Sequence, residues 1–459
     1  MSPLATTMLN DLEFPPDFFD PPDPRPAAWP DNPELRRAVE WFKSCMSPEQ
    51  WIQRRERAAK RLYLSAMGVD SGEGRFYDTK DSFGWYLFLA DALLDHIGNY
   101  DYVFGSRVVP LFQSIGRDLE LLLQVEGIGP RIQRIVMHEQ RQPNGGLFEL
   151  LVAACYRRAG AHVAFIDEKP GEARTHDMDV TFRGQTWAVE CKRMEVGEYG
   201  ERERLQIGKL WSTASQHLAQ LERSTLCRAS FHVDLSSIPT DYLAEKVHRW
   251  VRSGRGGLAW DDPIATGSIE TLDLKPLQSV LATDMVLSSS HRILELLTGR
   301  YVRNAQYQTL LKIHPCEHNP RYVDACEHAV VLHWESISDA ALNGKARDIR
   351  KKLSEATAQL PEGRQSIIHI GFEAVEGDRV ERLRYEKILT TARQFDPGDK
   401  ELEYVYCHYL VPESPPDQCW AFDETMQWCA IRARHEKPLE DGFLVLPAAG
   451  NRTGPHWQD

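Results

Sequence analysis

The 459-residue sequence lacks several features that would assign it to a well-defined class. It contains no run of eighteen apolar residues, which excludes a membrane-spanning helix. Its nine cysteines form no Cys-x-x-Cys pair and several lie in apolar patterns, which favours reduced thiols in a cytoplasmic protein over a disulfide framework. The N-terminal stretch is acidic and rich in proline, so we expect no secretory signal peptide there.

An excess of positive charge is also missing. The chain has 54 Lys and Arg against 67 Asp and Glu, a formal net charge of −13. Proteins that bind nucleic acid without selectivity neutralise many phosphates, so this balance disfavours a protein of that kind. Any binding to nucleic acid must come from local patches or from a partner.

The length predicts two or three domains. We expect an acidic, proline-rich arm over residues 1–32, because repeated proline prevents a helix or a central strand there. A helical domain is expected over residues 33–144 and an α/β core over residues 145–255. The remainder, residues 256–459, is expected to form a C-terminal α/β accessory domain.

The core begins with a helix that is apolar nearly all round, from Gly146 to Arg158, and such a helix is buried. A strand at His162–Ile166 and a hairpin follow. The arms of the hairpin, Asp177–Phe182 and Thr186–Lys192, alternate apolar and polar residues, which is typical of strands with two different faces. The sequence therefore predicts a hairpin with one apolar and one charged face.

The charged face carries the candidate site. A two-residue loop at Gly184-Gln185, with Gly in the first position of a type II′ turn, places Asp179 opposite Glu190 and Asp177 opposite Lys192. Neighbouring carboxylates repel one another unless a cation lies among them, and all-oxygen ligands suit Mg²⁺ or Mn²⁺. A lysine beside such a site can stabilise negative charge or orient a water. An ordinary solvated strand face with a cross-strand ion pair is the alternative.

The pattern Asp, ten residues, Glu-Cys-Lys resembles the motif of the PD-(D/E)XK nuclease superfamily, which includes Mrr-like and other restriction and DNA-repair endonucleases. The resemblance implies that Asp179, Glu190 and Lys192 are catalytic, with Glu149 on the preceding helix completing or supporting the site. It also implies that Mg²⁺ or Mn²⁺ binds to Asp179, Glu190 and the backbone carbonyl of Cys191. A methionine replaces the proline of the family's motif.

The resemblance further implies a restriction-endonuclease-like αβββαβ core, built on a mixed α/β (α+β) sheet. A predicted helix at Arg202–Glu222 and a predicted strand at Arg228–Leu235 would complete this core within residues 145–236. Gln216 and Lys209 lie on that helix, where related nucleases often place a glutamine near the site. A surface position for both side chains is the alternative.

Two residues beside the hairpin acids are secondary candidates. Asp177 shares the charged face of the hairpin. His176 precedes it and could act as a general base or support an acid. An ordinary loop histidine is the alternative interpretation.

Residues 119–136 resemble a helix-hairpin-helix, in which an apolar helix, a Gly-Ile-Gly-Pro turn and a second helix follow one another. In that motif the backbone N–H groups of the turn and the following helix N-terminus hold a DNA phosphate. Gly127, Gly129 and Arg131 are therefore candidate contacts to nucleic acid. The glycines equally suit a plain turn between helices, with Pro130 in the first helical position.

The accessory domain is predicted to be a second α/β unit. Its expected elements are strands Gln306–Ile313 and Ala329–Trp334, helix Asn343–Leu360, strand Ser366–Phe372, helix Asp378–Gln394, and strands Leu402–Leu410 and Trp428–Arg434. The order strand, long helix, strand repeats the order within the core. This indicates either a degenerate second copy of the nuclease-like fold or an ordinary accessory domain.

Two Cys-Glu-His triplets in this region offer two thiolates and two imidazoles, which are the ligands of a tetrahedral zinc site. The four residues are Cys316, His318, Cys326 and His328. Structural zinc sites favour two cysteines separated by two to four residues, so ordinary loop and strand residues are the alternative.

The sequence thus predicts a divalent-metal-dependent endonuclease that hydrolyses phosphodiester bonds, with DNA as the expected substrate and defence against foreign DNA as the expected setting. A catalytically inert nucleic-acid-binding or scaffold subunit of a defence or repair complex is one alternative, and an RNA endonuclease is another. Cleavage of both strands usually needs two active sites, which predicts a homodimer or a partner subunit. We expect no membrane partner.

Overall fold

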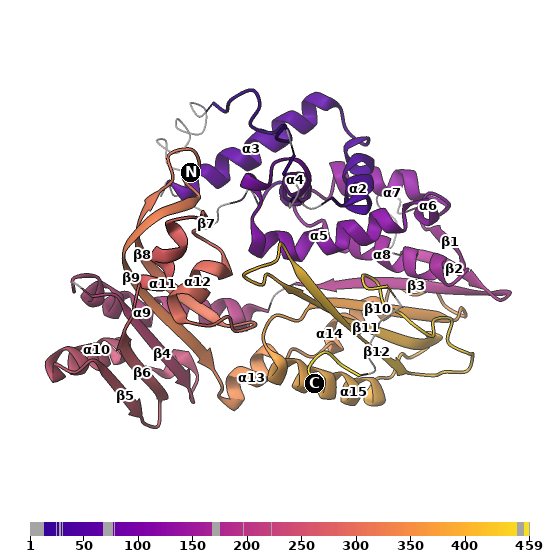
Figure 1. The fold of residues 1–459 in the computed structure, drawn as a ribbon. Helices are drawn as coiled ribbons and strands as arrows, with labels where there is room; N and C mark the ends of the chain where they lie inside the picture. The colour runs from indigo at the N-terminus through magenta and orange to yellow at the C-terminus, as the bar shows by residue number, and fades with distance from the viewer. Residues whose placement is uncertain are drawn as a thin grey trace.

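The computed structural model describes residues 13–23, 25–26, 29, 31–67, 77, 79–167, 175–195, 197–221, 223–447 and 454–458. These residues form two sheets, each with parallel and antiparallel strands, together with helices that cover them (Figure 1). The predicted mixed α/β fold class is therefore confirmed. Residues 1–12 of the expected N-terminal arm lie outside the described residues, and Phe19 from its described part is buried in the core.

The described residues between 33 and 137 are mostly helical, as the sequence predicts. The helices are α2 (Pro33–Lys43), α3 (Pro48–Ala66), α4 (Ser82–Asp95), α5 (Tyr102–Arg117), α6 (Leu119–Leu122) and α7 (Ile128–Met137). Asn32 caps α2 by accepting a hydrogen bond from the backbone N–H of Leu35. Ser47 and Gln50 form a capping box at the start of α3.

The first sheet has the strand order β1-β2-β3-β10-β11-β12. Its strands are β1 (His162–Phe165), β2 (Met178–Phe182), β3 (Gln185–Met194), β10 (Ser366–Glu373), β11 (Leu402–Glu413) and β12 (Ala421–Ala430). The parallel strands β3, β10 and β11 lie in the middle, and antiparallel strands flank them on both sides. Two strands far apart in sequence, β3 and β10, are therefore neighbours.

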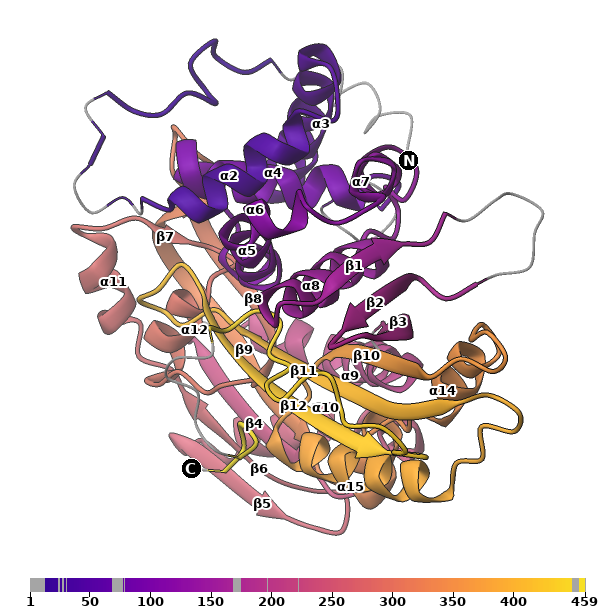
Figure 2. The same cartoon turned by 90° about the vertical axis from the view of Figure 1, so that its right-hand side faces the viewer.

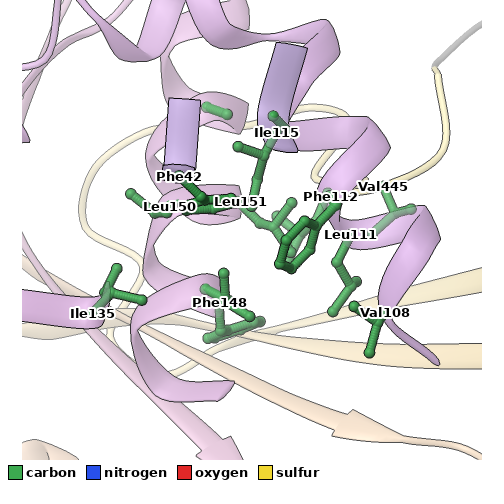
Figure 3. Close-up of a cluster of buried hydrophobic side chains, with 14 of the residues drawn as sticks. Phe42, Val108, Leu111, Phe112, Ile115, Ile135, Phe148, Leu150, Leu151 and Val445 are labelled. Carbon is green, nitrogen blue, oxygen red and sulfur yellow. The ribbon is translucent and has the colours of Figure 1, made fainter. Parts of the chain in front are cut away.

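Helices cover both faces of the first sheet (Figures 1 and 2). On one face, α8 (Asn144–Arg158) and α5 bury their apolar side chains with the apolar face of β2 and β3. Figure 3 shows part of this cluster, with Phe112 of α5 and Leu151 of α8 among its labelled side chains. On the other face, α14 (Arg350–Thr357) and α15 (Asp378–Gln394) bury Leu353 and Ile388 with residues of β10 and β11.

The second sheet is inserted between β3 and β10, with the strand order β5-β6-β4-β9-β7 and with β8 paired to β9. Its strands are β4 (Thr225–Phe231), β5 (Gly257–Asp261), β6 (Ala265–Thr271), β7 (Val286–Leu287), β8 (Gln306–Pro315) and β9 (Tyr322–Ser336). Helices α9 (Glu198–Ala219) and α10 (Tyr242–Ser253) cover one face. Helices α11 (Lys275–Leu281) and α12 (His291–Thr298) cover the other, and α13 (Asp339–Lys345) leads back to the first sheet.

This arrangement corrects the predicted composition of the core. The strand expected to complete it, β4, lies in the second sheet between β6 and β9, so the expectation that residues 145–236 form the whole core is wrong. The parallel neighbour of β3 is β10, which the chain reaches through α14. The strands that suggested a degenerate second copy are split between the sheets, because β9 belongs to the second and β10 to the first.

Three smaller expectations also differ from the structure. The domain boundary expected at residue 255 falls within the second sheet, between β4 and β5. The helix expected over residues 343–360 is two helices, α13 and α14. The last expected strand, at residues 428–434, overlaps only the end of β12. Among the described residues, no helix combines the length and the apolar character needed to cross a membrane.

Candidate functional site

The hairpin turn sets the register of the candidate site. The loop residues are Arg183 and Gly184, both with positive φ, 50° and 78°, as in a type I′ turn. Asp179 therefore pairs with Ala188, and the predicted pairing of Asp179 with Glu190 is wrong. The loop predicted from the sequence lies one residue later, with Gly184 in its first position.

The shift moves a different aspartate next to Glu190. Continuing the ladder beyond Met178 and Val189 brings Asp177 opposite Glu190, and the backbone N–H of Asp177 donates to the carbonyl of Val189 (3.1 Å). The Asp177 carboxylate accepts a hydrogen bond from the backbone N–H of Cys191 (2.7 Å). The predicted division of the hairpin into a charged and an apolar face survives, because Met178 and Val189 are fully buried. Asp177 thus takes the position that the sequence assigned to Asp179.

Asp179 has different partners. Its Oδ1 atom lies 2.7 Å from Nε2 of His176 and accepts a hydrogen bond from Arg364 at 2.7 Å. Burial raises the pKa of Asp179, but the two hydrogen bonds outweigh burial and hold the pKa below its ordinary value. His176 therefore contacts one of the hairpin acids, Asp179. The same carboxylate forms an ion pair with Arg364.

Glu190 is the most buried acid of the cluster, with none of its surface exposed. Burial and the neighbouring Asp177 carboxylate raise the pKa of Glu190 to about 9. Burial likewise raises the pKa of Asp177. The ammonium group of Lys192 donates a hydrogen bond to Glu190 and remains partly exposed, with 20% of its side chain accessible.

Gln359 joins this pair from the turn after α14. In the amide orientation that satisfies both partners, its nitrogen donates to Glu190 Oε1 and its oxygen accepts from Lys192 Nζ, each at 3.0 Å. Sequence reasoning missed Gln359, because the helix that faces β3 was expected to be the one that follows it directly. The helix that packs against β3 on the face of Glu190 and Lys192 is α14, which lies about 160 residues later in the chain.

Glu149 of α8 reaches the cluster together with an arginine. Arg131, on α7, forms an ion pair with Glu149, and its guanidinium nitrogen lies 3.7 Å from Asp177 Oδ1. Only 8% of Arg131 is exposed. The structure thus gathers Glu149, Asp177, Glu190 and Lys192 around this part of the hairpin, with a guanidinium among the acids.

The helix-hairpin-helix-like turn packs against the edge of the first sheet. Gly127 has a left-handed conformation (φ 77°), and an added Cβ would lie 3.3 Å from Phe165 of β1. Glu126 forms a parallel bridge with Ala164 of β1. Gly127 and Gly129 are exposed, whereas the third predicted contact, Arg131, points into the acid cluster and is buried.

The remaining candidates lie elsewhere. Gln216 and Lys209 are exposed on α9, which packs on the second sheet, so the structure does not bring them to the hairpin. The Cys-Glu-His triplets do not converge either, because the thiol of Cys316 faces Asp324 and that of Cys326 faces the carbonyl of His328. In the described part of the chain, no three His, Cys, Asp or Glu side chains are arranged to hold a metal ion.

The smaller set formed by Asp177 and Glu190 nevertheless fits a hard cation. Both offer oxygen atoms, and Glu190 Oε2 is buried without a hydrogen-bond partner among the described residues. The backbone carbonyl of Cys191 could add a third oxygen, as the resemblance implies. The third carboxylate expected there, Glu149, is instead paired with Arg131.

Comparisons of the chain with protein-family models, with curated proteins and with solved structures found no match.

Proposed function

We propose that this protein is a divalent-metal-dependent phosphodiesterase, an endonuclease of the PD-(D/E)XK type, with Asp177 in the position of the first motif acid. The observation that carries the proposal is the contact between two buried carboxyl groups of raised pKa, Asp177 and Glu190, beside the ammonium group of Lys192. Perturbed carboxyl groups of this kind are typical of functional sites.

The order of elements supports the proposal. Helix α8 precedes the antiparallel strands β1, β2 and β3, and α14 precedes the parallel neighbour β10. This order is similar to the αβββαβ order of the nuclease superfamily if the second sheet is taken as an insertion before the second helix. An insertion on a loop between core elements is tolerated because it leaves the contacts of the core intact.

Each residue has a defined part in the proposed chemistry. Asp177, Glu190 and the carbonyl of Cys191 would hold Mg²⁺ or Mn²⁺, which supplies Lewis acidity and lowers the pKa of a bound water. Lys192 orients the attacking water and stabilises the negative charge that develops on phosphorus oxygens. Gln359 fixes the Lys192 ammonium group and the Glu190 carboxyl group relative to each other.

One observation favours a second candidate function, a catalytically inert binding or scaffold subunit. The Arg131 guanidinium lies among the acids and already compensates the charge of Glu149. In an inert protein this guanidinium serves permanently in place of a metal ion, whereas in an active nuclease a metal ion binds to Asp177 and Glu190 beside it. Metal binding therefore separates the two candidates.

The decisive experiment is incubation of the purified chain with circular, linear and single-stranded DNA and with RNA, in Mn²⁺ or Mg²⁺ and in chelator. We expect metal-dependent cleavage, which Asp177→Asn and Lys192→Ala each slow by about a hundredfold or more. Asp179→Asn is the matched control, because its carboxylate binds Arg364 and His176. We expect it to slow cleavage by less than about tenfold, since it changes an ion pair with a partly exposed arginine.

Two results would contradict this assignment. Full activity in Asp177→Asn, combined with loss of activity in Asp179→Asn, would restore the sequence-based choice of the first acid. No cleavage of any substrate, together with no thermal stabilisation by millimolar metal, would favour the inert subunit. The substrate panel also distinguishes DNA from RNA, and a defence role or a dimer remains a proposal that depends on this outcome.

A further inference from the structure

A second polar site lies at the carboxyl end of the strand that carries Lys192. A cavity of about 590 Å³ opens at the carboxyl ends of β3 and β10 and is lined by Arg193, Glu373, Arg107 of α5 and Lys345 of α13. Ligand pockets commonly have volumes of 300–1,000 Å³, and in open α/β sheets they lie outside the carboxyl ends of the strands. Size and position both match a small-molecule site.

Two guanidinium groups lie side by side at the base of the cavity. Glu373 forms an ion pair with Arg107 and lies 3.5 Å from the guanidinium of Arg193. Glu195, on the cavity wall, is a second carboxylate that acts on Arg193. The Arg193 side chain is only 7% exposed, and burial lowers its pKa in spite of these two carboxylates, so they compensate its removal from water only in part. An anion in the cavity would complete that compensation.

The guanidinium of Arg193 also has unused hydrogen-bonding capacity. Its Nη1 atom is buried and has no hydrogen-bond partner among the residues that the structure describes. An arginine presents its donors in a fixed fork that fits phosphate oxygens. Arg193 therefore offers a preformed donor to a ligand in the cavity.

The rest of the lining is suited to a ligand with a phosphate group and a flat ring. Arg347 adds a further guanidinium group to the cavity wall, and Arg384 lies beside it in an ion pair with Glu381. Tyr86 and Phe104 provide aromatic surface on the side of α4 and α5. Arginines that bind phosphate and aromatic rings that contact a base are the recurring elements of nucleotide recognition.

We infer that this cavity binds a mononucleotide, with the phosphate at Arg193 and Arg107 and the base against Tyr86 and Phe104. The site is separate from the Asp177–Glu190 cluster and needs no divalent metal, so the inference does not rest on the proposed nuclease activity. The cavity is also lined by Gly197 and Arg347, from the two segments through which the chain enters and leaves the second sheet. A bound nucleotide would therefore contact the connections between the two sheets.

The test is calorimetric titration of the full chain, in chelator, with the four nucleoside monophosphates, the corresponding nucleosides and inorganic phosphate. We expect saturable binding of at least one monophosphate at concentrations below about 1 mM. The matching nucleoside should bind at least about tenfold more weakly, because it leaves the guanidinium groups without an anion. Equal binding of nucleoside and nucleotide, or no saturable binding of any monophosphate, would overturn the inference.

Variants locate the bound phosphate. Arg193→Lys keeps the charge and so the fold, but it loses the planar fork, and we expect at least about tenfold weaker binding. Arg347→Gln tests the rim of the cavity without changing a buried group, and it should also weaken binding. Arg249→Gln, at an exposed position on α10, is the control and should bind as the unchanged chain does. Unchanged affinity in both Arg193→Lys and Arg347→Gln would place the ligand elsewhere and refute the proposed site.

Discussion

Glu190 shows how a single carboxyl group can couple the fold to a cation. It is fully buried, and burial together with the Asp177 carboxylate keeps it neutral over the physiological pH range. A divalent ion would offset both the burial of Glu190 and the repulsion from Asp177, because it compensates the charge of both carboxylates. Metal binding at this pair must therefore release a proton.

The first prediction concerns the pH dependence of that binding. Since the pKa of Glu190 is about 9, Mg²⁺ or Mn²⁺ affinity should rise about tenfold per pH unit between about pH 6 and 8, which calorimetry in buffers of different protonation enthalpy can measure. Without metal, the stability that neutral Glu190 contributes is fully present below its ordinary pKa of 4.5 and is lost as pH rises through about 9. Glu190→Gln should abolish proton release, and an affinity independent of pH would refute the proposed coupling.

At this scale the sequence identified the face of the acids but not the aspartate that lies opposite Glu190. The alternation of residues 177–182 and 186–192 determines which side chains share a face. Moving the loop by one residue leaves that division unchanged. The pairing partner does depend on it, and Asp177 and Asp179 are both acids on the same face. Gln359 and Arg364 lay outside the prediction, because contacts across about 170 residues leave no local signal.

At the scale of elements, the turn that determines which aspartate lies opposite Glu190 contains an arginine in an unusual backbone conformation. Arg183 adopts a positive φ of 50°, which residues other than glycine, asparagine and aspartate rarely adopt. From the sequence alone, the favoured loop is therefore the one in which only Gly184 has a positive φ. The strands on either side, with their buried Val180 and Trp187, determine the register that the turn must accept.

The second prediction follows from that backbone conformation. Arg183→Asn should raise the free energy of unfolding by about 0.5 kcal/mol, because Asn-Gly is the preferred type I′ pair. Gly184→Ala should lower it by about 1 kcal/mol through backbone strain alone, since an added Cβ meets no atom within 4 Å. Urea denaturation measures both. Destabilisation by Arg183→Asn would instead indicate that residue 183 is an ordinary strand position, as in the loop first expected.

The sequence also did not distinguish which later strand, β4 or β10, lies beside β3. Both β4 and β10 are short apolar strands that follow a helix, so order and length alone do not separate them. The difference lies in burial on two faces: residues 366–372 of β10 are all buried, whereas Arg228 and Ser230 of β4 are partly exposed. A continuous apolar run is typical of a central parallel strand, and Ile-Ile-His-Ile-Gly-Phe in β10 is that signal.

At the scale of the whole molecule, the inserted sheet is held to the N-terminal helices by a buried arginine. Arg321, just before β9, donates to the carbonyls of Gly98 (2.9 Å) and Tyr100 (2.8 Å). It also lies 3.8 Å from the carboxylate of Asp101, which caps α5 through the N–H of Phe104. Arg321 is 2% exposed. No local pattern in the sequence marks a contact of this kind, because its partners lie about 220 residues away.

The last prediction tests whether this contact holds the inserted sheet in place. Arg321→Ala should lower the free energy of unfolding by about 3 kcal/mol, because it leaves Asp101 and two carbonyls buried without their partner. Arg303→Ala is the matched control, since its ion pairs with Asp378 and Glu413 connect the inserted sheet to the first sheet and are partly exposed. We expect it to cost about 0.5 kcal/mol. Hydrogen exchange adds a local readout: in Arg321→Ala the amides around Gly98 and at the start of α5 should exchange faster, while those of β10 and β11 keep their protection. Similar small effects of the two substitutions on unfolding and exchange would show that the sheet is held by its apolar contacts instead.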